Sequence, residues 1–131
     1  MRRILVSVVA LASLVGGACS SGDGDDASKA VCATRDKTQM ATNGQPVALD
    51  QYPEIVDGLQ QAAKVAPAGI KSDFLRVHKV LKPFVEALIK ANGDSEAAAQ
   101  DPEFQKLMGA VSTKAANASA ARIRKYYEKH C

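Results

Sequence analysis

The chain has no Trp, few other aromatic residues and only three cysteines among its 131 residues. So few cysteines exclude a cysteine-dense miniprotein, and five prolines and nine glycines are too few for a collagen-like or wholly disordered chain. The length allows one compact domain and leaves little room for a second. A small globular domain remains.

The chain also lacks a strong excess of either charge, with 17 Lys and Arg against 14 Asp and Glu. Arg2 and Arg3 fall in the N-terminal segment, so the remainder carries 15 basic residues (17 − 2) against the same 14 acidic ones. A near-neutral domain has no field that would steer it onto nucleic acid. We therefore expect no nucleic-acid partner.

The first 18 residues differ in composition from the rest of the chain. A short basic start is followed by an apolar run from Ile4 to Ala18, in which only Ser7 and Ser13 are polar. This pattern is typical of a signal peptide, and it is shorter than the roughly 20 apolar residues that a permanent membrane span needs. We predict a signal peptide at residues 1–18 and no transmembrane helix in the mature protein.

The small residues Gly16, Gly17 and Ala18 precede Cys19, and a stretch rich in Ser, Gly and Asp follows it. Over about its first 28 residues the chain resembles a bacterial lipoprotein precursor of the actinobacterial type. The resemblance implies a diacylglyceryl group on the Cys19 thiol and cleavage just before it. The lipid would anchor the protein to the outer face of the cell membrane. Gly16 departs from the family, which usually has Leu there, and the resemblance concerns export rather than activity.

The same small residues also suit ordinary signal peptidase, whose cleavage would release a soluble secreted protein. The number of cysteines favours lipidation instead. If Cys19 carries lipid, Cys32 and Cys131 remain as an even pair in an oxidising compartment. A cysteine at the end of the chain is also a poor place to preorganise chemistry. We therefore predict a Cys32–Cys131 disulfide in an extracytoplasmic protein.

Residues 19–28 have almost nothing apolar to bury, so we expect a flexible polar tether after the lipidated cysteine. Its aspartates, Asp23, Asp25 and Asp26, are best explained as solvated charge. A calcium loop would need a Glu that closes the coordination set twelve positions after the first ligand, and none is present. No metal site is predicted here.

Residues 29–131 form the predicted helical domain. Apolar spacing predicts a short helix from Ser28 to about Met40 and long helices over about residues 50–66, 67–91 and 102–129. No window alternates with period two, so strands are not expected. Because the connections are short, we predict an all-α fold, a small antiparallel bundle of three long helices and one short one.

The third of these helices carries the clearest pattern in the chain. Its apolar residues follow a 4-3-4-3-4 spacing and must face a partner: Ile70, Phe74, Val77, Leu81, Phe84 and Leu88. Pro83 lies off this stripe, so it should bend the helix rather than end it.

Residues for catalysis are scarce. The chain has no Gly-rich phosphate loop, His-x-x-x-His pair or CxxC motif. His78, at the edge of the apolar stripe, is best explained as a half-buried imidazole, and His130 beside Cys131 does not make a closed metal site. We predict no catalytic residues, cofactor or metal. Glu54 with Asp57, and Asp94 with Glu96, are carboxylates within one turn of each other and are best explained as solvated helix ends. The alternative left open is an enzyme or enzyme subunit that uses His78 and dispersed carboxylates.

The C-terminal helix is basic. Four of its residues, Arg122, Arg124, Lys125 and Lys129, could bind anionic lipid headgroups, a wall polymer or an acidic envelope protein. The same charges also complement the helix dipole and keep the surface soluble, which is the simpler explanation. The sequence thus predicts a lipid-anchored, non-catalytic binding or interaction module of the cell envelope, whose ligand and oligomeric state it leaves open.

Overall fold

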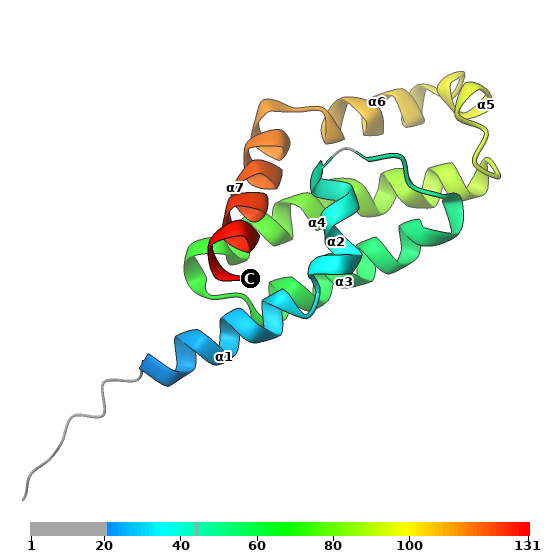
Figure 1. Ribbon diagram of the computed structural model, residues 1–131. Helices are drawn as coiled ribbons and strands as arrows, with labels where there is room; N and C mark the ends of the chain where they lie inside the picture. The colour runs from blue at the N-terminus through cyan, green and yellow to red at the C-terminus, as the bar shows by residue number, and fades with distance from the viewer. Residues whose placement is uncertain (1–20, 44) are drawn as a thin grey trace, which may run out of the picture.

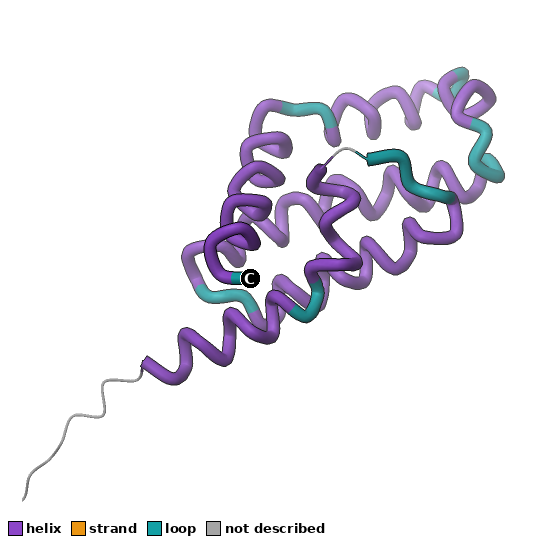
Figure 2. Tube along the Cα trace, viewed as in Figure 1, coloured by secondary structure: helices purple, strands orange, loops and turns teal. Residues whose placement is uncertain are grey.

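The computed structural model describes residues 21–43 and 45–131. The predicted signal peptide and Cys19 lie outside them. Seven α-helices and one short 3₁₀ helix, but no strand, are found in these two ranges, which confirms the all-α class (Figure 2). In chain order the elements are α1 (Ser21–Cys32), α2 (Arg35–Asn43), η1 (Leu49–Gln51), α3 (Tyr52–Val65), α4 (Ala68–Lys90), α5 (Ser95–Ala99), α6 (Pro102–Val111) and α7 (Lys114–His130).

The 23-residue helix α4 is the centre of the arrangement. It forms an antiparallel pair with α3, while α7 packs on it toward one end and α6 toward the other (Figure 1). Helix α2 contacts both α3 and α7, and α1 contacts α3 and α7 before it projects away from the bundle. The molecule therefore has two distinct ends, which we name the α1 end and the α5–α6 end.

The N-terminal helices differ from the prediction. The single helix expected from Ser28 to Met40 is divided into α1 and α2, and the break lies at Ala33 and Thr34. The Thr34 hydroxyl donates to the Val31 carbonyl over 2.7 Å, which offers the backbone an alternative to helix continuation.

The flexible tether predicted for residues 19–28 is wrong from Ser21 onward, because α1 begins there. A polar composition predicts that a segment is exposed. An exposed segment can still be helical when the far end of the helix packs against the core. Val31 is fully buried in the core, and Asp25 and Asp26 lie in the second turn, toward the positive end of the helix dipole.

The long C-terminal helix expected over 102–129 is likewise divided, into α6 and α7. The break falls at Ser112 and Thr113, where the Thr113 hydroxyl accepts a hydrogen bond from the Ala116 amide at 3.2 Å. This N-cap starts a new helix in a new direction. Consequently α6 lies along the distal half of α4, whereas α7 returns to the α1 end.

The predicted apolar stripe of α4 is confirmed. Ile70, Phe74, Val77 and Leu88 are buried, and Leu81 and Phe84 are half-buried. Helix α4 also continues through Pro83 to Lys90, as expected for a proline away from the packed face.

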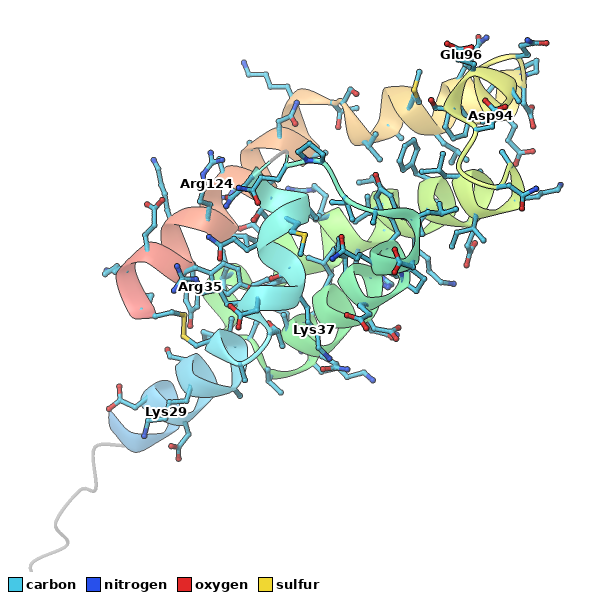
Figure 3. All side chains as sticks on the ribbon, turned by 45° about the vertical axis from the view of Figure 1, so that its right-hand side comes forward. Lys29, Arg35, Lys37, Asp94, Glu96 and Arg124 are labelled. Carbon is cyan, nitrogen blue, oxygen red and sulfur yellow. A yellow bond between two sulfur atoms is a disulfide. The ribbon has the colours of Figure 1, made fainter. Side chains whose placement is uncertain are left out.

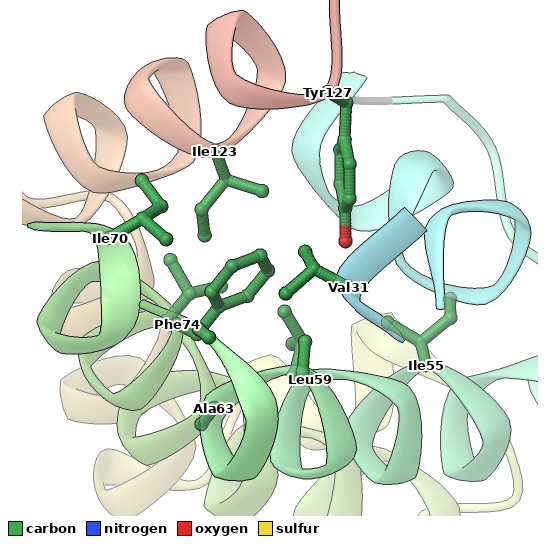
Figure 4. Close-up of a cluster of buried hydrophobic side chains, with 11 residues drawn as sticks. Val31, Ile55, Leu59, Ala63, Ile70, Phe74, Ile123 and Tyr127 are labelled. Carbon is green, nitrogen blue, oxygen red and sulfur yellow. The ribbon is translucent and has the colours of Figure 1, made fainter. Parts of the chain in front are cut away.

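The stripe serves two cores. The main core joins α1, α3, α4 and α7. Four residues meet at its centre with 0% exposure: Val31, Leu59, Phe74 and Ile123 (Figure 4). The distal core is much smaller. It consists of Leu88, Ala98 and Phe104 with half-buried neighbours, and its Phe104 ring stacks on Phe84 at 5.2 Å between centroids.

Candidate functional site

The structure places Cys32 and Cys131 in a disulfide, as the sequence predicted. Their Cα atoms are 5.6 Å apart and their sequence separation is 99 residues. The bond joins the last turn of α1 to the C-terminal residue after α7, so the projecting helix is covalently fixed to the bundle. Ser28 adds a second link, because its hydroxyl lies 3.0 Å from the hydroxyl of Tyr126.

An ionic cluster around a buried carboxylate connects α4 to α7. Asp73 is only 3% exposed and accepts hydrogen bonds from Arg122, whose Nη2 lies 2.7 Å from Oδ1 and whose Nε lies 3.0 Å from both carboxylate oxygens. Ser119 is also buried, and its hydroxyl accepts from Arg76 at 3.1 Å and from Arg122 at 3.3 Å. Arg76 Nη1 also lies 4.0 Å from Asp73 Oδ1, so the carboxylate is held by one arginine from its own helix α4 and one from α7.

The hydrogen bond from Arg122 holds the pKa of Asp73 below its ordinary value, although burial acts in the opposite direction. Asp73 therefore stays ionised. Since its oxygens are occupied by a fixed arginine fork, the cluster is suited to joining helices rather than to transferring protons.

A second buried polar cluster joins α2 to α7. The Tyr127 hydroxyl lies 2.6 Å from the Thr38 hydroxyl and 3.3 Å from that of Thr34. Burial raises the pKa of Tyr127, so the phenol stays neutral. The Thr34 hydroxyl also donates to the Val31 carbonyl of α1, and the Thr38 hydroxyl to the Thr34 carbonyl just before α2, which leaves the cluster satisfied.

The predicted anionic-partner patch is only partly brought together. Arg122, Lys125 and Lys129 line one shallow depression between α7 and the start of α4. Arg124 lies on another side of α7, where its Nη1 donates to the Thr42 carbonyl of α2 at 3.3 Å (Figure 3). Arg122 forms an ion pair with Asp73. Of the four predicted residues, only Lys125 and Lys129 therefore remain without a hydrogen bond or ion pair of this kind in the described ranges.

Two more lysines lie on the other side of α1. Lys37 of α2 and Lys64 of α3 line a second shallow depression, which also includes Ala30 and Ala33 beside the end of α1. Figure 3 shows Lys37 near the base of α1 and Asp94 at the opposite end of the molecule. We name the exposed set Lys37, Lys64, Lys125 and Lys129 the lysine collar. Neither depression is lined by an Asp or Glu.

Of the hollows described here along residues 21–43 and 45–131, the one of greatest volume lies at the α5–α6 end. A groove of about 480 Å³ runs between the distal half of α4 and helices α5 and α6. The distal core forms one wall of the groove, and four small residues leave the space open. Ala87 comes from α4, Ala91 caps the end of α4, and Ala97 and Ala98 come from α5. The charged lining consists of three carboxylates, from Glu86, Asp101 and Glu103, and one lysine, Lys90. Glu86 also pairs with Lys82 at 3.3 Å. This groove is the candidate ligand site.

The residues named for the alternative enzyme are not assembled in this groove. His78 is half-buried in the middle of α4 and does not line it. Asp94 instead caps α5, where its Oδ1 accepts from the amides of Glu96 at 3.0 Å and Ala97 at 2.9 Å. No group of three or more His, Cys, Asp or Glu residues that could hold a metal occurs among residues 21–43 and 45–131.

Sequence reasoning missed both the ionic cluster and the groove. A signal for the first was present, since Asp73 stands three residues after Ile70 and four before Val77, on the apolar stripe itself. The groove had no such signal, because it depends on the turn that lays α6 against α4.

No protein-family model, no curated protein and no solved structure matches this chain. Within the part of the chain that the structure describes, no helix is long and apolar enough to cross a membrane.

Proposed function

We propose that this protein is an exported helical module, anchored to the outer face of the cell membrane by lipid on Cys19, that binds a small ligand without transforming it. The N-terminal sequence pattern supports export, and the Cys32–Cys131 disulfide suits an oxidising compartment outside the cytosol. The observation that carries the binding function is the groove between α4, α5 and α6.

The groove suits a small organic cation with an apolar body. Its volume of about 480 Å³ falls in the range of small-molecule sites. Alanines and the Phe104 wall offer apolar contact. Lys82 pairs with Glu86 at 3.3 Å, but the three carboxylates of Glu86, Asp101 and Glu103 still exceed the two nearby lysines, Lys82 and Lys90, and favour a positive group. A ligand of this kind would be held by contact and charge, with no nucleophile or proton donor in a reactive arrangement.

Export and anchoring are tested by intact mass spectrometry of the native, non-reduced protein from the membrane fraction. We expect a chain that begins at Cys19, carries a diacylglyceryl group and has both remaining thiols oxidised. The variant Cys19→Ala should be absent from washed membranes. A full-length chain with free thiols in the cytosol would contradict the proposal, and a soluble secreted chain that begins near Cys19 would replace anchoring by secretion.

Ligand binding is tested with tryptamine, an aromatic amine. Because the chain has no Trp, indole fluorescence reports the probe alone when it is excited where tyrosine does not absorb. We expect its anisotropy to rise on titration with the mature protein, and we expect indole-3-acetate, the anionic counterpart, to show no rise. The variant Ala91→Met should abolish the rise in anisotropy because the larger side chain fills the groove. The control variant Gly109→Ala on α6 should preserve the rise, because a Cβ at this position meets no atom within 4 Å. Equal responses to both probes, or none, would contradict the proposed ligand class.

A further inference from the structure

The lysine collar surrounds the base of α1, the helix that leads to the predicted lipid. Lys37 and Lys64 lie on the α2–α3 side, and Lys125 and Lys129 on the α4–α7 side, next to Tyr126, which is hydrogen bonded to Ser28. All four are exposed. None lies within 4.0 Å of a carboxylate oxygen in the described ranges, where the ion pairs involve Lys29, Arg76, Lys82 and Arg122 instead.

We infer that the lysine collar binds the phosphate headgroups of the membrane that holds the lipid anchor. The inference rests on the proposed anchoring through Cys19. Clusters of about four or more basic residues next to a membrane anchor bind anionic lipid surfaces. Val65, which is 42% exposed, lies in the depression with Lys64 and adds an apolar contact at the same end.

The distances are compatible with this contact. Cys19 precedes the first residue of α1 by two positions, and α1 meets Tyr126 at Ser28. The seven helical steps from Ser21 to Ser28 rise about 10 Å, which is comparable to the screening length of about 8 Å at physiological salt. The collar can therefore feel the surface potential even when α1 stands upright, and a tilt of α1 brings it into contact.

Acidic side chains on α1 oppose this attraction, so the contact must be made by the collar. Asp25 and Asp26 are exposed, and Asp26 lies 3.9 Å from the ammonium of Lys29. The other end of the molecule is less suited to the membrane, since residues 94–104 contain four carboxylates and no Lys or Arg, and only Lys90 and Lys106 flank this segment within four residues. Opposite charge at the two ends thus directs the collar toward headgroups and leaves the ligand groove facing away.

The test compares lysine reactivity in the lipidated protein reconstituted into two kinds of vesicle. One contains phosphatidylcholine alone, and the other contains phosphatidylcholine with about a third phosphatidylglycerol. A neutral amine-reactive reagent and peptide mass spectrometry give the rate at each lysine, with Lys90 and Lys106 at the α5–α6 end as internal references. We expect the collar to react at least about threefold more slowly in anionic vesicles, the references to be unchanged, and high salt to remove the difference.

A matched pair of variants separates membrane contact from local structure. Lys125→Gln with Lys129→Gln should restore the reactivity of Lys37 and Lys64 in anionic vesicles to its value in neutral ones. The control, Lys79→Gln with Lys106→Gln, should leave their protection intact.

Equal collar reactivity in both vesicles would overturn the inference while leaving the anchored module standing. Protection that appears only in whole envelopes would also overturn it, because the partner would then be another envelope component. A protein without lipid on Cys19 would instead remove the proposed function on which the inference rests.

Discussion

The two ends of the molecule are built differently. At the α1 end four helices enclose the main core, two polar clusters join neighbouring helices, and a disulfide fixes α1 to the C-terminus. At the α5–α6 end three buried residues form the distal core, and an open groove lies beside it. The difference indicates that stability resides at the α1 end, whereas the α5–α6 end keeps space that a ligand can fill.

The disulfide should give the largest effect. Replacing both partners, Cys32→Ser and Cys131→Ser, removes a cross-link that closes a loop of about 100 residues, for which the chain-entropy model gives about 4 to 5 kcal/mol. Urea unfolding followed by circular dichroism measures this loss. Wild-type protein in reductant should match the double variant, and a change under about 1 kcal/mol would show that the α1 end does not depend on the cross-link.

Truncation of one phenylalanine in each core compares the two ends directly. Phe74→Ala should lower the free energy of unfolding by about 3 to 5 kcal/mol, because Phe74 is fully enclosed in the main core. Phe104→Ala should cost less, about 2 to 3 kcal/mol, because the adjoining groove lets the site collapse or admit water. Denaturant midpoints check both values. Equal losses would mean that the distal core is as tightly packed as the main one.

The main features of the α1 end could be predicted from the sequence. The 4-3-4-3-4 stripe identified α4 because one helix face must be buried, and the number of cysteines identified the pair Cys32 and Cys131. Asp73 was missed for a specific reason. A charged residue on an apolar stripe is usually assumed to point elsewhere, and only the position of Arg122 on α7 makes its burial tolerable.

Most of the α5–α6 end could not be predicted. The hydroxyl of Thr113 competes locally with an apolar pattern that would otherwise continue, so periodicity alone merged α6 with α7. The alanines of the groove are also uninformative in isolation, because a small residue marks a close helix contact as often as a hollow. Their meaning appears only after α5 and α6 are folded back against α4.

The ionic cluster around Asp73 should make the α1 end sensitive to acid. Asp73→Asn should lower the free energy of unfolding by about 1 to 3 kcal/mol at neutral pH, because the Arg122 guanidinium loses its charged acceptor. Arg122 is half exposed, so water can hydrogen bond to it in the variant. The folded-state pKa of Asp73 is lowered from 3.8, so its contribution is complete above that pH and is lost as the pH falls further, through the folded value.

Wild type and Asp73→Asn should therefore converge in stability at low pH. Tyr127→Phe is the matched control, since it removes hydrogen bonds to Thr38 and Thr34 in the same region but no carboxylate. Its cost of about 1 kcal/mol should not change between neutral and acidic pH. A gap between wild type and Asp73→Asn that persists in acid would show that the charge of Asp73 contributes little.

Two glycines in helices should respond to the same substitution with opposite sign. A Cβ at Gly58 would lie 2.9 Å from Lys37 Cβ and 3.0 Å from Thr38 Cγ2, where α2 crosses α3 at the α1 end. Gly58→Ala should therefore destabilise by about 1 kcal/mol, since overpacking outweighs the gain in helix propensity. A Cβ at Gly109 of α6 meets nothing within 4 Å, so Gly109→Ala should stabilise by about 0.5 to 1 kcal/mol. Shifts of the same sign in the thermal midpoint would mean that helix packing at Gly58 and at Gly109 is equally loose. Shifts of opposite sign would locate the tight contact where α2 crosses α3, beside Lys37 of the lysine collar.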